Sequence, residues 1–144
     1  MAESVAARLR KHGFKCKTVE ITVRDNGLYS FSRQIHLRQP TNITNEIVTA
    51  AFQLFKDNYK WEHPIRRLGI RAADLVLDDI PVQLDLFGNQ EKKEKLEKLD
   101  RTVDEIRRRF GYFSIQRAAM YQDKVLSHLD AGTHTIHPHS YFHR

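Results

Sequence analysis

The stretch that decides the fold is KTVEITVRDNGLYSFSRQIHL, residues 17–37. From Lys17 to Arg24, apolar residues alternate with polar or charged ones, which predicts a strand with one buried face and one face in water. Asp25-Asn26-Gly27 then predicts a hairpin turn, because Asn and Gly accept positive φ angles. Leu28 to Leu37 alternates again and is the predicted return strand.

The segments on either side of this hairpin complete an α+β pattern. The predicted elements are a helix Ala2–His12 that Gly13 ends, a helix that Thr41 or Asn42 caps and that runs to about Asn58, and a strand Ile65–Ala72. The order α-β-β-α-β predicts an open antiparallel-type sheet with two helices packed on one face.

The chain divides into three parts along its length. Residues 1–77 form the predicted domain, and residues 78–90 are predicted to be an extended linker. Residues 91–144 are predicted to be a helical tail: a polar helix to Phe110, a short helix between Ser114 and Asp130, and an irregular His-rich end. The polar helix has a thin apolar stripe, so we expect it to dock on this protein, on a second copy or on another subunit.

Composition narrows the classes of function. No apolar run approaches the roughly 20 residues of a membrane span, and the N-terminus has no apolar signal core. Cys16 is the only cysteine, which fits a reducing cytoplasm. We expect its side chain to be a small buried apolar group and not a nucleophile. Residues 1–77 contain 13 Lys/Arg and 7 Asp/Glu, whereas the remainder contains 11 of each. The excess positive charge therefore belongs to the domain and indicates an anionic partner, most simply nucleic acid.

Basic residues alternate along the third predicted strand. Arg67, Gly69 and Arg71 point the same way in a period-two strand, so the glycine leaves room for an anion to approach the backbone between two guanidinium donors. Arg24 adds charge from the hairpin. In the return strand, Ser32 and Arg33 offer a hydroxyl and a guanidinium to a phosphate oxygen.

This pattern suits a sheet laid on a nucleic-acid backbone, with affinity but little base reading. The alternative is a solvated sheet face whose arginines serve solubility, and composition alone does not separate the two.

Several segments of this sequence together resemble a known protein family. The domain resembles the little-finger domain of Y-family DNA polymerases, the lesion-bypass group that includes bacterial polymerase IV and UmuC-type repair proteins. The similarity rests on Glu3 to Arg10, Phe31-Ser32-Arg33, Pro40-Thr41-Asn42, and above all Pro64 to Arg71; Leu75 to Phe87, Asp104 to Gly111 and Ser114-Ile115 resemble the tails of the same polymerases.

The resemblance implies a sheet backed by two helices that lies in the major groove of primer-template duplex. Carried over by residue, it implies phosphate contacts from Ser32 and Arg33 on one strand and from Arg67 and Arg71 on another, with close backbone approach at Gly69. The polymerase's palm, fingers and thumb, and its acidic ligands for Mg²⁺, have no counterpart in this chain. We therefore expect a non-catalytic part of a polymerase with no cofactor of its own.

A second departure concerns the sheet. The family domain begins with a strand before its first helix, and this chain starts within that helix. A missing first strand leaves unpaired backbone groups, which a homodimer or the C-terminal tail would cover.

Gln83-Leu84-Asp85-Leu86-Phe87 resembles the pentapeptide by which bacterial polymerases and repair proteins bind the sliding clamp. Pro81 holds its entry extended and Gly88 releases the chain after it. Leu84, Leu86 and Phe87 would fill a hydrophobic groove on the partner, Gln83 would orient the peptide through its amide, and Asp85 would stay in solvent. The alternative is an edge strand of this same domain, which we would favour without the polymerase-like domain upstream.

One weaker signal remains. His134, His137, His139 and His143 are close enough in sequence to ligate zinc or nickel, but they have no clear scaffold, so we predict no metal site.

From the sequence as a whole, we expect a DNA-binding and clamp-tethering part of a translesion polymerase that acts in the repair of DNA damage. The alternative is an adaptor that binds the clamp or another repair partner and hardly touches DNA.

Overall fold

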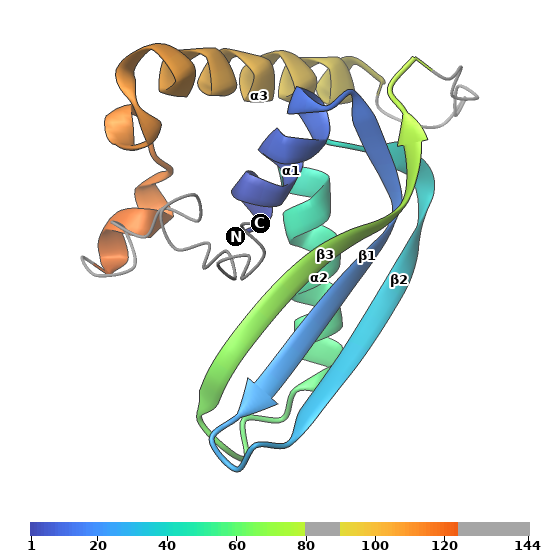
Figure 1. The fold of residues 1–144 in the computed structure, drawn as a ribbon, viewed down its shortest axis with the longest axis vertical. Coiled ribbons are helices and arrows are strands. Elements are labelled where there is room, and N and C mark those ends of the chain that lie inside the picture. The colour runs from blue at the N-terminus through green and yellow to red at the C-terminus, as the bar shows by residue number, and fades with distance from the viewer. Residues whose placement is uncertain (80–89, 124–144) are drawn as a thin grey trace, which may run out of the picture. The chain divides into compact units, whose positions relative to one another are not determined.

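The computed structural model describes residues 1–79 and 90–123. Its centre is an antiparallel sheet of strands β1 (Phe14–Asp25), β2 (Ser30–Thr41) and β3 (Ile65–Leu77), in the order β2-β1-β3. Helices α1 (Ala2–Lys11) and α2 (Thr44–Asn58) cover one face of this sheet (Figure 1). The expected α+β architecture is confirmed.

The alternation of β1 builds the core. Val19, Ile21 and Val23 are buried under the two helices, where they meet apolar side chains such as Ile47 of α2 and Leu9 of α1. Each fully buried aliphatic side chain contributes roughly 1.5–3 kcal/mol to folding. Among residues 1–79 and 90–123, no helix covers the other face of the sheet (Figure 1), and we call it the open face.

The hairpin turn lies where we expected, but its geometry differs. The loop Asn26–Leu28 is closed by hydrogen bonds from Asp25 N to Tyr29 O (3.1 Å) and from Tyr29 N to the Asp25 carboxylate (3.0 Å). Leu28, with φ 69°, adopts the left-handed conformation, whereas Gly27 does not. A three-residue loop needs that conformation at its last position, and in this sequence the glycine comes one residue too early.

All three strands are longer than the sequence pattern predicted. Cys16 pairs with Thr41 on one side and with Leu75 on the other, which carries β2 and β3 past their expected ends. The register with β2 shifts between Cys16 and Thr18, and Pro40 lies in the stretch of β2 opposite this irregularity. Because β2 is an edge strand, a residue without an N–H is tolerated there.

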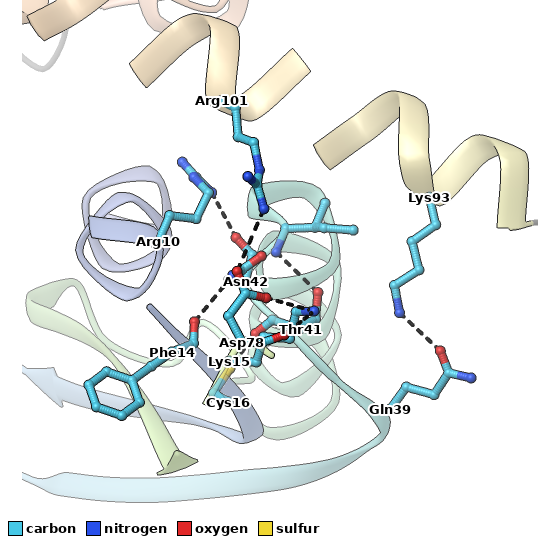
Figure 2. A network of polar contacts seen from close by, with 11 residues as sticks. Arg10, Phe14, Lys15, Cys16, Gln39, Thr41, Asn42, Asp78, Lys93 and Arg101 are labelled. Carbon is cyan, nitrogen blue, oxygen red and sulfur yellow. Dashed lines mark hydrogen bonds and ion pairs between the residues drawn. The ribbon is translucent and has the colours of Figure 1, made fainter. Parts of the chain in front are cut away.

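The start of α2 also differs from the prediction. The helix begins at Thr44, after Ile43, and neither Thr41 nor Asn42 caps it. The Thr44 N–H donates instead to the carboxylate of Asp100 at 2.7 Å, 56 residues further along the chain. Thr41 Oγ1 accepts from Ile43 N (3.1 Å), and the Asn42 amide donates to Phe14 O (3.2 Å), so both residues brace the connection instead (Figure 2).

Asp100 belongs to α3 (Gln90–Phe110), the predicted polar helix. Arg10 donates to the Asp100 carboxylate at 3.1 Å and to Asn42 O at 2.7 Å, and the side chains of this ion pair are only 10% and 8% exposed. Lys93 donates to Gln39 at 2.9 Å (Figure 2). The first part of α3 therefore docks on its own domain, as one of our three alternatives proposed, through charged and polar contacts.

The chain forms two compact units, Met1–Thr102 and Val103–Arg144. In the described part of the second unit, Gly111 ends α3 with φ 94°, as expected. Residues 112–123 contain two short 3-10 helices, Tyr112–Ser114 and Ala118–Gln122, in place of the start of the expected helix. None of the helices in residues 1–79 and 90–123 is both long and apolar enough to cross a membrane.

Candidate nucleic-acid interface

The middle of the open face presents small side chains. Thr22 of β1 pairs with Ser32 of β2 and with Gly69 of β3, so the three residues form one row across the sheet. The Thr22 and Ser32 hydroxyl oxygens are 3.0 Å apart. A Cβ on Gly69 would meet the Thr22 Cβ at 3.7 Å, which is an ordinary contact. The fold would therefore accept an alanine at position 69, and the lack of a side chain there leaves the backbone open to a ligand.

The next row toward the hairpin is strongly positive. Arg24 pairs directly with Arg67 of β3, and like charges in that position repel one another. Together with Leu28 and Arg66, these two arginines line a pocket of about 510 Å³. The Arg24 Nε is buried and has no hydrogen-bond partner among the described residues. We call this the arginine pocket, and its chemistry suits a phosphate oxygen.

On the side of the Thr22 row that lies away from the hairpin, the net charge of the open face is closer to neutral. Arg71 pairs with Glu20, and the Arg71 Nη1 lies 3.9 Å from the Glu20 carboxylate. Arg71 is mostly exposed, so this long contact contributes little and leaves guanidinium donors accessible to an anion.

The far end of the open face carries a polar cluster that the sequence did not reveal. Thr18 Oγ1 lies 2.6 Å from His36 Nδ1 and 2.5 Å from the Asp74 carboxylate. Thr18 and His36 belong to the expected outward-facing sets, but Asp74 lies beyond the predicted end of its strand. The carboxylate makes this end unsuited to a phosphate, so the positive end of the face is the hairpin end.

Arg33 is not brought together with the other predicted DNA-binding residues. It points to the face that carries the helices, where its guanidinium lies 5.5 Å from the centre of the Phe31 ring and donates to Asn58 Oδ1 at 3.2 Å. The open face thus gathers Arg24, Ser32, Arg67, Gly69 and Arg71, with Arg33 across the sheet from them.

Cys16 behaves as the sequence predicted. It is buried, its Sγ donates to Thr41 O (3.4 Å; Figure 2), and burial raises the pKa of its thiol to about 11. A thiol protonated at neutral pH is a poor nucleophile.

The predicted clamp-binding peptide, residues 83–87, and the four histidines at 134–143 lie outside the described residues. The chain before the peptide is fixed at Asp78, whose N–H donates to Gly13 O (2.9 Å) and whose carboxylate pairs with Lys15 (2.7 Å) and Arg101 (3.6 Å; Figure 2). In residues 1–79 and 90–123, no group of three His, Cys, Asp or Glu side chains is placed to hold a metal ion.

Comparison with known proteins adds independent evidence. Residues 1–86 match the model of the impB/mucB/samB family C-terminal domain. The chain is 41% identical over 129 residues to DNA polymerase IV of Acetivibrio thermocellus, and 36% identical over 122 residues to DNA polymerase IV 2 of Bacillus subtilis. These alignments include 90% and 83% of this chain but 32% and 28% of the two relatives. The chain thus spans about a third of the length of the curated relatives it matches.

Proposed function

Because this chain belongs to the impB/mucB/samB family of Y-family DNA polymerases and carries its C-terminal little-finger domain, we propose that it grips primer-template duplex and tethers a lesion-bypass polymerase to the sliding clamp. Residues 1–77 supply the DNA contacts, and Gln83 to Phe87 supply the clamp contact. The chemistry of nucleotide transfer and its Mg²⁺ belong to the rest of such a polymerase, so this part works by binding.

The observation that carries the DNA-binding proposal is the row Arg24–Arg67 beside Gly69. Two guanidinium groups face each other across neighbouring strands, and the buried Arg24 Nε has no partner in the described chain. A phosphate bound between the two guanidinium groups would neutralise this repulsion. Next to it, the bare Gly69 backbone and the Ser32 hydroxyl allow a second phosphate of the same strand to approach.

Such contacts read the DNA backbone and not its sequence, which suits a polymerase that must work on any template. A weak DNA site and a clamp site on one chain would reinforce each other through effective concentration, and either contact would still release readily.

Salt dependence tests the DNA contacts. Affinity for primer-template duplex should fall steeply as salt rises, because phosphate contacts release counterions. Arg67→Ala combined with Arg71→Ala should reduce the slope of log K against log salt by about 2. Fluorescence anisotropy of labelled duplex over a salt series measures this slope.

The matched control is Lys95→Ala combined with Lys98→Ala, which removes the same charge from exposed positions of α3. It should leave the slope nearly unchanged. A duplex affinity too weak to measure at moderate salt would contradict the proposal and favour the adaptor alternative.

A further inference from the structure

Five aromatic rings form a continuous chain at the hairpin end of the domain. Phe31, Phe55 and Tyr59 are partly buried against the core and lie in its middle, with centre-to-centre distances of 6.4 Å (Phe31–Tyr59) and 5.3 Å (Phe55–Tyr59). Trp61 contacts Phe55 at 5.5 Å and Tyr59 at 5.4 Å, and Tyr29 contacts Phe31 at 6.4 Å. The two outer rings, Tyr29 and Trp61, are 68% and 69% exposed. A buried set of rings thus supports two exposed ones.

Trp61 is held outward by its backbone. Its φ of 57° lies in the left-handed region, which a bulky residue rarely adopts and which is concentrated at functional positions. The Tyr59 hydroxyl donates to His63 O and closes the loop that carries Trp61. The indole meets Phe55 and Tyr59 at interplanar angles of 83° and 72°. The ring is therefore positioned by edge-to-face contacts while most of its surface remains accessible.

The arginine pocket lies at the same hairpin end as this aromatic chain, with Arg24 and Arg67 on the open face and Phe31 on the face that carries the helices. Asn26 N donates to Pro64 O at 3.0 Å, which ties the hairpin turn to the loop after Trp61. Leu28 lines the pocket and Tyr29 follows it in the chain. Residues 24–33 and 56–67, which form this end, contain six basic and three acidic side chains. Exposed aromatic rings among an excess of basic groups match the chemistry of unpaired nucleotides, whose bases stack while their phosphates pair.

We propose that the hairpin end binds single-stranded nucleic acid, with an unpaired base stacked on Trp61 or Tyr29 and a phosphate in the arginine pocket. This inference deepens the proposed function and rests on it: the open face takes duplex, and the hairpin end takes the strand where pairing stops. A protein partner would also cover apolar rings, but the excess positive charge of this end favours an anionic polymer.

Trp61 is the only tryptophan in the chain, so its fluorescence reports on this site alone. Titration of the full chain with a short thymidine oligonucleotide should quench that emission along a saturable curve, because a stacked base quenches indole fluorescence. Blunt-ended duplex without unpaired bases should bind with little quenching.

Variants separate stacking from charge. Trp61→Ala should weaken binding of a labelled thymidine oligonucleotide on the order of ten- to a hundredfold, the loss expected when one stacked base is released. Trp61→Phe should retain affinity within a few-fold, because it keeps a ring at the same place. The control is Phe52→Ala, which removes a ring that is 60% exposed on α2 but neither lines the arginine pocket nor belongs to the chain of five rings. It should have no effect.

Two results would overturn the inference. One is unchanged emission at oligonucleotide concentrations that saturate binding; the other is an equal loss of affinity for Trp61→Ala and Phe52→Ala. In either case, salt-dependent duplex binding that still requires Arg67 and Arg71 would leave the proposed function standing. Absence of duplex binding with normal quenching would reject the duplex proposal and keep the single-strand site. Thermal unfolding of each variant checks that it is folded.

Discussion

At the scale of single residues, Gly69 is a glycine that the fold does not require. Its backbone is not in the left-handed region and its neighbours leave space for a Cβ, so folding alone does not require a glycine there. Gly13 is the opposite case: nothing lies near its missing Cβ, but its φ of 69° disfavours any side chain. The fold explains the glycine at position 13, whereas the glycine at position 69 is not required by the fold.

Gly69→Ala should therefore separate stability from binding. We expect unfolding free energy to stay equal or rise by about 0.5–1 kcal/mol, since Ala suits a strand better than Gly. Duplex affinity should fall about fivefold, the effect of losing one backbone-to-phosphate hydrogen bond of about 1 kcal/mol. Thermal unfolding and anisotropy measure the two quantities.

Gly13→Ala is the matched control, with the opposite result. It should lower stability by about 1 kcal/mol, because the left-handed conformation is unfavourable for Ala, and leave affinity unchanged. Equal affinity of the Gly69→Ala variant and the unaltered protein would remove the case for close backbone approach.

At the scale of elements, the most buried contact between α3 and the rest of the domain is made by one carboxylate. Asp100 accepts from the first N–H of α2 and from Arg10 of α1, so it joins three helices at one point. The apolar stripe that the sequence predicted as the docking surface contributes less, since Leu99 is largely exposed. A charged carboxylate is stable in a buried position only when hydrogen bonds and ion pairs satisfy its oxygens.

Asp100→Asn should therefore destabilise the domain by about 2–4 kcal/mol, because it removes the charge that balances buried Arg10 and weakens the bond to Thr44 N. Urea unfolding followed by Trp61 fluorescence measures this. Lys95→Ala breaks an exposed pair with Glu91 (2.6 Å) on the same helix and should cost at most about 0.5 kcal/mol. Similar values for the two variants would mean that α3 adds nothing to the stability of the domain.

The same elements show what the sequence could predict. The hairpin and the buried stripes of α1 and α2 follow from local periodicity, and the open face follows from β1 and β3 alternation. The strand ends near Pro40 and the Asp100 cap depend on pairing with residues far away in the chain. Leu28 adopts the left-handed conformation because the loop has three residues. This requirement of the loop outweighed the preference of Asn26 and Gly27 for positive φ angles. The chain of aromatic rings has no period at all, because its members come from β2, α2 and a loop.

At the scale of the whole molecule, the predicted clamp peptide lies between two fixed positions. Asp78 before it is bound to Gly13 and Lys15, and Arg101 after it reaches the same Asp78 carboxylate.

We expect micromolar affinity for a purified bacterial sliding clamp, or about −8 kcal/mol. Leu86→Ala combined with Phe87→Ala should abolish it, because these side chains fill the partner's groove, and the unfolding temperature should not change. Isothermal titration calorimetry measures the affinity. Leu77→Ala, at an exposed apolar position before the linker, should bind normally. If the double variant binds as tightly but unfolds at lower temperature, the pentapeptide belongs to the fold as an edge strand.

The shared carboxylate of Asp100 also affects how the protein is made. A ribosome releases the chain from its N-terminus, so α1, the sheet and α2 emerge before residue 100 does. Until residue 100 has emerged, the Thr44 N–H at the start of α2 lacks the carboxylate acceptor that it has in the complete fold. A protein trimmed at residue 86, where the family match ends, would remain at that stage. We therefore expect a piece that reaches past Asp100 to be more stable than one that ends at the boundary of the family match.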